Sequence, residues 1–135
     1  MGRLLAIDYG ARRVGLALSD PLKMIANPYQ TILNKSDNNL ILEIERIIDA
    51  EDVEQIIIGL PLGMAGQITE QTKKVEEFAD KLADRGITIK YEDERWSSVA
   101  AKRSMREQNI KTGHNKGLVD QTAAAIFLQQ YLDQQ

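Results

Sequence analysis

The chain has 135 residues, 43% of them hydrophobic, and its 17 basic and 20 acidic residues give a net charge of −3. The absence of cysteine excludes disulfides, thiolate metal sites and cysteine nucleophiles. No apolar run is long enough to cross a membrane, and the first one ends at Asp8. We therefore expect a cytoplasmic protein whose single domain, residues 1–135, buries one core.

The first half of the chain opens with short β-compatible runs and then alternates helix with strand. Strands are expected at 4–8, 14–19 and about 29–33, separated by turn-prone residues. A helix over about 40–48 follows, with its N-cap among residues 36–38 and apolar residues at helical spacing. The strand over 53–60 contains three consecutive isoleucines, which predict burial on both faces of a sheet.

The second half continues the alternation. A helix is expected over 69–82 and is closed by a glycine, and a strand over 88–92 follows it. A helix over 99–107 and a polar loop over 109–117 come next. The last helix, 118–132, has almost no polar face and should be buried on most sides.

This order of elements, β-β-β-α-β-α-β-α-α, predicts an α/β fold. Three strands would form an antiparallel meander, and right-handed crossovers would add two strands parallel to the first. We expect a five-stranded mixed sheet flanked by helices, with the first strand in the middle.

The charges are segregated along the chain. Residues 37–54 carry seven acids and one base, whereas residues 95–116 carry six bases and one acid. The basic segment fits either a solvated helix face or a surface that follows a phosphate backbone. Its bases are Arg95, Lys102, Arg103, Arg106, Lys111 and Lys116.

Three acids stand where strand or helix ends should meet: Asp8 after the first strand, Glu94 after the fifth, and Asp120 in the first turn of the last helix. Ligand sites of α/β folds lie at the carboxyl ends of parallel strands. Carboxylates converging there could hold two Mg²⁺ ions for phosphodiester hydrolysis, one ion activating a water and the other stabilising the leaving oxygen.

Each acid also has a structural explanation. Asp8 could cap a turn, Glu94 could form a surface ion pair, and Asp120 could stabilise the helix dipole. Strand alternation puts Asp93 and Glu94 on opposite faces, so Asp93 remains an alternative ligand. The one histidine, His114, lies in the polar loop, which disfavours a serine–histidine–aspartate triad.

Four blocks of sequence resemble the YqgF/RuvX family, in its order and spacing and over nearly the whole chain. They are Asp-Tyr-Gly-Ala-Arg-Arg-Val-Gly-Leu-Ala at 8–17, Gly-Leu-Pro at 59–61, Asp-Glu-Arg at 93–95 before a serine pair, and Lys-Gly-Leu-Val-Asp at 116–120 before two alanines. The resemblance implies an RNase H-like fold, shared with Holliday-junction resolvases, and a nuclease that matures the 5′ end of precursor 16S ribosomal RNA. It also implies that Asp8, Glu94 and Asp120 are the acidic site residues. RNase H-like nucleases commonly carry an acid at the end of the fourth strand, where this chain has Gly-Leu-Pro.

We therefore expect a nuclease dependent on Mg²⁺ or Mn²⁺, with two ions held by Asp8, Glu94 and Asp120, acting on structured RNA. Asp8 would bridge both ions, and Arg12 and Arg13 beside it would contact phosphate. The loop over 109–117 would become ordered on substrate. The bases that would hold the substrate backbone are Arg95, Lys102, Arg103, Arg106 and Lys116.

Other functions remain open at this stage. A resolvase of branched, four-way DNA has the same chemistry but needs a dimer for symmetric cleavage, and we expect a monomer or a weak homodimer. A non-catalytic RNA-binding or ribosome-assembly module would keep the carboxylates for stability. An actin-like ATPase needs a second domain, for which 135 residues leave no room. The choice between endonuclease and exonuclease also stays open.

Overall fold

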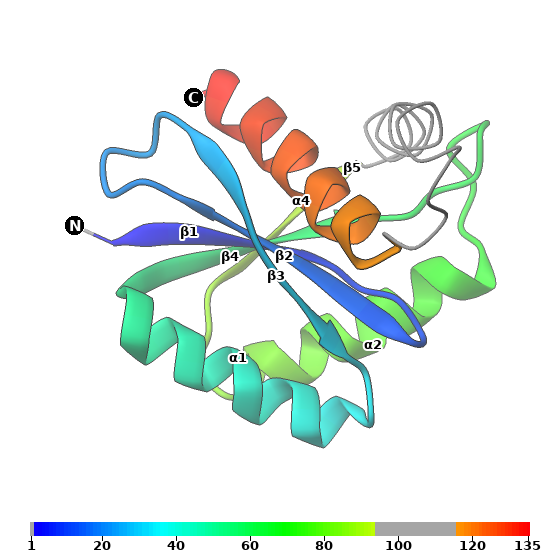
Figure 1. Cartoon of the computed structure of the whole chain (residues 1–135). Helices are drawn as coiled ribbons and strands as arrows, with labels where there is room; N and C mark the ends of the chain where they lie inside the picture. Colours follow the sequence, from blue (N-terminus) through cyan, green and yellow to red (C-terminus); the bar gives the residue numbers. More distant parts are fainter. Residues whose placement is uncertain (1, 94–115) are drawn as a thin grey trace.

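The computed structural model of the chain describes residues 2–93 and 116–135, and it has a five-stranded sheet between two layers of helix (Figure 1). The strands lie in the order β3-β2-β1-β4-β5. The elements are β1 (Arg3–Asp8), β2 (Arg13–Ser19), β3 (Ala26–Leu33), α1 (Asp37–Glu51), β4 (Val53–Leu60), α2 (Glu70–Ala83), β5 (Ile89–Asp93) and α4 (Lys116–Asp133).

The predicted sheet is confirmed. β1 pairs with β2 and β2 with β3 in antiparallel fashion, whereas β4 pairs in parallel with both β1 and β5. β1 is therefore the central strand, as expected. The carboxyl ends of the parallel strands β1, β4 and β5 meet at one edge of the sheet, where α/β folds place their ligand sites.

β3 is longer than predicted. It begins at Ala26, three residues before the predicted start at about 29, and the turn-prone residues Asn27 and Pro28, expected to precede the strand, lie within it. β3 is an edge strand, where the missing N–H of proline is tolerated. Its register with β2 shifts between Leu16 and Ala17, which pair with Gln30 and Pro28. The skipped residue, Tyr29, marks a β-bulge, a site at which proline is also accepted.

The helices begin at the predicted caps, with one difference. The Ser36 side chain accepts a hydrogen bond from the Asn39 amide at the start of α1, and Thr69 forms a capping box with Thr72 at the start of α2. α4 begins at Lys116, two residues before the predicted start, and so includes Gly117, whose cost of about 1 kcal/mol relative to alanine the helix tolerates. No helix in the described ranges is long and apolar enough to span a membrane.

The described residues do not cover every predicted element. The predicted helix over 99–107 and the part of the predicted loop over 109–115 lie outside them. For residues 116–119, only the backbone is described.

Helices α1 and α2 cover one face of the sheet (Figure 1), and most of the side chains buried between them and the sheet are large and apolar. Alternate residues of each strand point into it, as the period of two along a strand requires. Fully burying a leucine, isoleucine or phenylalanine contributes about 1.5–3 kcal/mol, so this layer supplies much of the stability. The fully buried members are Leu5, Ile7, Val14, Leu16, Leu40, Ile44, Ile56, Ile58, Val75, Phe78 and Leu82.

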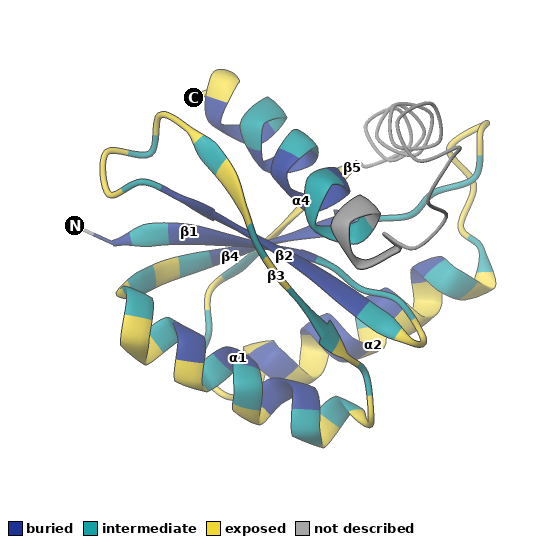
Figure 2. Cartoon of the chain, in the orientation of Figure 1, coloured by how far each residue is buried: buried dark blue, intermediate teal, exposed yellow. Residues whose placement is uncertain are grey.

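Helix α4 covers the other face, where the two central antiparallel strands carry small residues. Ala6 of β1 and Ala17 of β2 pack against α4, whose Phe127 and Leu128 are fully buried. Small residues on the strands let the helix axis approach the sheet closely. The nearly unbroken apolar surface predicted for this helix is confirmed by burial along most of its described length (Figure 2).

Candidate active site

Asp8 lies at the carboxyl end of the central strand, on the face of the sheet that α4 covers. It follows Leu4 and Ala6 at intervals of two, and both of these pack in the α4 core. Asp8 also pairs with Gly15 of β2, and residues opposite each other in an antiparallel pair point to the same face. The Asp8 carboxylate is therefore directed to the side from which α4 approaches.

Asp120 reaches the same place because the second turn of α4, which begins at Asp120, packs directly on Gly15. A Cβ atom added to Gly15 would lie 2.3 Å from both the carbonyl carbon and the carbonyl oxygen of Asp120. Only glycine allows main-chain atoms to come this close to a strand. Since Gly15 is the partner of Asp8, the structure brings Asp8 and Asp120, 112 positions apart in the sequence, to one site.

Arg13 fixes the Asp120 side chain. Its Nε donates a hydrogen bond to Oδ2 of Asp120 at 2.8 Å, and both side chains are largely screened from solvent, with 33% and 19% exposed. A charge-assisted hydrogen bond of this kind is short and orienting. The contact involves one of the two carboxylate oxygens, Oδ2, so Arg13 orients Asp120 without using Oδ1.

Polar side chains of α4 hold the rest of the helix on the sheet. Gln121 Nε2 donates to Thr31 Oγ1 at 3.3 Å, and the Gln129 amide bridges the β2–β3 connection by donating to the Met24 carbonyl and accepting from the Ala26 amide. These contacts bind both ends of α4 to β3 and its approach. These contacts hold α4, and Asp120 with it, in place on the sheet.

The acids at the end of β5 point to opposite faces of the sheet. Ile89 packs in the α1/α2 core, and the pKa of Tyr91 is raised by burial and by the acids Asp80 and Glu76 of α2. Strand alternation places Asp93 on that same side, opposite to Asp8, whereas Glu92 lies toward α4 and accepts a hydrogen bond from Gln134. Glu94 is the next residue and lies outside the described residues.

The two described carboxylates fit a hard divalent cation in their chemistry. Mg²⁺ and Mn²⁺ prefer oxygen ligands, and Mg²⁺ usually takes only one or two protein carboxylates and keeps its waters. Within residues 2–93 and 116–135, no three acids or histidines gather closely enough to hold a metal ion. A third ligand, if it is Glu94 as expected, comes from beyond that part of the chain.

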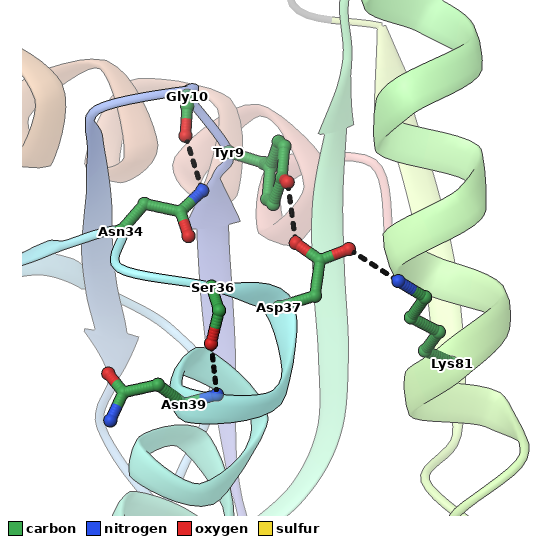
Figure 3. Close-up of polar contacts among 7 residues, drawn as sticks. All are labelled: Tyr9, Gly10, Asn34, Ser36, Asp37, Asn39 and Lys81. Carbon is green, nitrogen blue, oxygen red and sulfur yellow. Dashed lines mark hydrogen bonds and ion pairs between the residues drawn. The ribbon is translucent and has the colours of Figure 1, made fainter.

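The turn after Asp8 is held from the opposite face of the sheet (Figure 3). Tyr9 stacks on Phe78 with ring centres 4.7 Å apart, and its hydroxyl donates to Asp37 Oδ1 at 2.7 Å. Lys81 of α2 donates to the other oxygen of Asp37 at 2.9 Å. This network joins β1, α1 and α2 at one point, and it was not predicted because its members are far apart in the sequence.

The charges of this network shift its pKa values. Burial alone would raise the pKa of Asp37, but the hydrogen bonds from Lys81 and Tyr9 outweigh it, and the net pKa lies below the usual value. The pKa of Tyr9 is raised by burial and by its hydrogen bond to the Asp37 carboxylate. Asp37 is therefore ionised near neutral pH, and its charge stabilises the fold.

The predicted substrate-binding bases are only partly described. Arg12 is exposed in the turn after Asp8, and Arg13 is engaged with Asp120. The bases Arg95, Lys102, Arg103 and Arg106 and the side chain of Lys116 lie outside the described residues.

A family model described as "RuvX: Holliday junction resolvase" matches residues 2–134 of the chain. The chain belongs to the RuvX family. Relatives in the family include a Clostridium botulinum protein that is 42% identical over 97% of this chain and 96% of its own length, and a Bacteroides fragilis protein that is 41% identical over 98% and 97%. Both are named "Putative pre-16S rRNA nuclease". The resemblance expected from the sequence is confirmed, and the family places the chain among nucleases.

Solved structures confirm the RNase H-like fold of this RuvX-family chain. RuvC of T. thermophilus, in complex with a Holliday junction substrate, superposes with a TM-score of 0.59 over 98% of this chain and 94% of RuvC, at 12% identity. The Fowlpox virus resolvase, in complex with Holliday junction DNA, gives 0.58 over 98% and 97%, at 10% identity. At such identities the likeness establishes the fold alone.

The close packing at Gly15 yields a first prediction for this RuvX-family protein. Gly15→Ala places a Cβ against the main chain of Asp120, so α4 must move, and the free energy of unfolding should fall by about 1–3 kcal/mol. Urea unfolding measures the loss, and amide chemical shifts of residues 120–124 should change. The control is Gly63→Ala, whose Cβ meets only the flexible end of Gln67. Equal stability of the Gly15 variant and the wild type would contradict this packing.

A second prediction concerns Asp37. Because its pKa is lowered by folding, its contribution to stability is present above the unfolded pKa of about 3.9 and is lost as the pH falls through the folded value. Asp37→Asn should therefore lose about 1 kcal/mol at pH 7 and approach the wild type near pH 3. Urea unfolding at several pH values measures this difference. Asp49→Asn, at an exposed acid of the same helix, is the control, and an Asp37 effect that does not change with pH would refute the interpretation.

Proposed function

We propose that this protein is a metal-dependent nuclease that processes the 5′ end of precursor 16S ribosomal RNA. The observation that carries the proposal is the convergence of Asp8 and Asp120 through Gly15 at the carboxyl end of the central strand. Two carboxylates on one face of an RNase H-like sheet provide ligands for a hard cation beside a scissile phosphate. The name of the relatives supports the choice of precursor ribosomal RNA as substrate.

Asp8, Glu94 and Asp120 would hold the metal, Mg²⁺ or Mn²⁺, with two ions as the expected number. Bound metal would supply Lewis-acid charge to the phosphate and acidify a water. Glu94 is preferred to Asp93 as the third ligand because strand alternation puts Asp93 on the side of α2, away from Asp8. Glu94 would then replace the acid that RNase H-like nucleases commonly carry at the end of the fourth strand, where this chain has Gly-Leu-Pro.

The protein's own residues position the reacting groups. Asp8 is held at the end of the central strand, whose residues 4–7 are all buried, and Asp120 is oriented by Arg13. Rigid placement of this kind is what a hydrolytic site requires, because small displacements of the ligands reduce the rate strongly. Arg12, which is exposed beside Asp8, would contact a phosphate oxygen, and Arg13 would add positive charge next to the same site.

The remaining bases would hold the substrate backbone. Arg95, Lys102, Arg103, Arg106 and Lys116 supply the positive charge that a chain of net charge −3 otherwise lacks. The loop over 109–117 would become ordered when substrate binds. We further propose that the whole chain acts as one cytoplasmic nuclease domain, as a monomer or a weak homodimer.

The proposal is tested by comparing cleavage of two substrates. Asp8→Asn and Asp120→Asn should keep the fold but lower metal-dependent cleavage of precursor 16S rRNA by at least about 100-fold, since each removes a charged ligand. Initial rates with Mg²⁺ or Mn²⁺ are measured on the precursor RNA and on a four-way DNA junction. Asp49→Asn, far from the site along α1, is the matched control and should retain activity.

The outcomes separate the candidate functions. Cleavage of the RNA that needs metal and both aspartates supports the proposal. Preferred cleavage of the junction would make the protein a resolvase. Full activity of the Asp8→Asn variant would show that Asp8 is not a catalytic ligand. Binding of the RNA by the wild type without any cleavage would favour an RNA-binding module.

A further inference from the structure

Two exposed cations, Arg12 and Lys35, are brought together at the edge of the sheet where Asp8 lies. The backbone amide of Asn34 donates to the Arg12 carbonyl at 2.8 Å, and the Asn34 side chain donates to the Gly10 carbonyl at 2.8 Å (Figure 3). Lys35 follows Asn34 directly. The β3–α1 connection is therefore tied to the turn that follows Asp8, and Lys35 stands beside that turn although it is 23 positions from Arg12 in the sequence.

The positive charge at this point is not neutralised within the described part of the chain. Both side chains are exposed, and neither forms an ion pair with a described residue. Six other described bases do form ion pairs: Arg13, Lys23, Arg46, Lys73, Lys81 and Arg85. Arg12 and Lys35 thus differ from most of the described basic surface.

The acids nearest in sequence to Lys35 have other partners. Both oxygens of Asp37 are taken, one by Tyr9 and the other by Lys81 (Figure 3). The next acid along α1 is Glu43, which pairs with Arg46. Neither Asp37 nor Glu43 therefore pairs with Lys35, and the amino end of α1, capped by Ser36, adds partial positive charge at the same point.

The sheet register connects these cations to the carboxylates. Asp8 of β1 is opposite Gly15 of β2, and Arg13 of β2 is opposite Leu33 of β3, the residue before Asn34. The carboxylates and the two cations thus lie along the same edge of the sheet, across β1, β2 and β3. A polyanion whose scissile bond lies at Asp8 can continue over the β1–β2 turn toward the start of α1.

We propose that Lys35, together with Arg12, binds the phosphate backbone of the nucleic acid that is cleaved at Asp8 and Asp120. The inference rests on the proposed nuclease function and adds to it a second contact surface, formed by the β1–β2 turn and the β3–α1 connection. Each cation contacts one phosphate and releases the counterions condensed there. The contact contributes to binding and does not select a sequence, because phosphates carry no sequence information.

The experiment measures binding, so that it does not depend on catalysis. Asp8→Asn protein, which should not cleave, is titrated with a fluorescently labelled RNA spanning the 5′ end of precursor 16S rRNA at several salt concentrations. Lys35→Gln is introduced into this protein, alone and with Arg12→Gln. The control is Lys23→Gln, which removes the same charge at the β2–β3 connection, by the opposite edge of the sheet, where Lys23 pairs with Glu54.

Lys35→Gln should weaken binding about tenfold at about 50 mM salt, with the difference vanishing toward about 1 M, and should reduce the salt slope by about 0.7–0.9. The double variant should reduce the slope by about twice that amount, whereas Lys23→Gln should leave it unchanged. Equal effects of Lys35→Gln and Lys23→Gln, or no effect of either, would overturn the inference while the nuclease proposal stands. Failure of the Asp8→Asn protein to bind RNA, joined with absence of cleavage by the wild type, would overturn both.

Discussion

The close contact between Gly15 of β2 and the main chain of Asp120 in α4 is the constraint on which the candidate site depends. A side chain at position 15 would occupy the space of the Asp120 main chain, so the helix can pack this closely on β2 only over a glycine. Asp8 is the strand partner of Gly15, and this single contact therefore brings together two acids that come from opposite ends of the sequence. Arg13, two residues before Gly15, then orients the Asp120 side chain.

The two faces of the sheet differ in the size of the side chains that they carry near the site. The face covered by α1 and α2 is packed with large aliphatic side chains and holds the turn after Asp8 through Tyr9 and Asp37. The face covered by α4 carries small residues near the site, which let the helix come close. The α1/α2 layer packs one face of the sheet and α4 packs the other. Polar groups therefore meet at the carboxyl end of β1, where other α/β folds also place their ligand sites.

Much of this could be predicted from the sequence, for reasons that are local. The strands β1, β2 and β4, the capping residues Ser36 and Thr69, and the apolar last helix follow from periodicity and capping chemistry. Asp8 and Asp120 are candidates from the sequence because they stand at element ends, and their role at a site stays a prediction. The length of β3 was not predictable, since a proline reads as a turn unless the strand is known to be an edge with a bulge.

The contacts that make the site were hidden because they join distant residues. No sequence pattern indicates that Arg13 contacts Asp120 or that Asn34 contacts Gly10. Gly15 alone indicates only a glycine that weakens a strand. The net charge of −3 also concealed how charge is arranged, because Asp37 is neutralised by its own partners while Lys35, two residues away, is not. The tertiary structure therefore determines which charged side chains are free to contact a substrate.

The most direct test of the central claim is a crystal structure of the protein with Mn²⁺, in which anomalous scattering locates the metal independently of the refined coordinates. We expect a manganese peak bound by carboxylate oxygens of both Asp8 and Asp120, with the Asp120 main chain of α4 packed on Gly15. Manganese bound elsewhere, or α4 displaced so that Asp120 lies apart from Asp8, would contradict it.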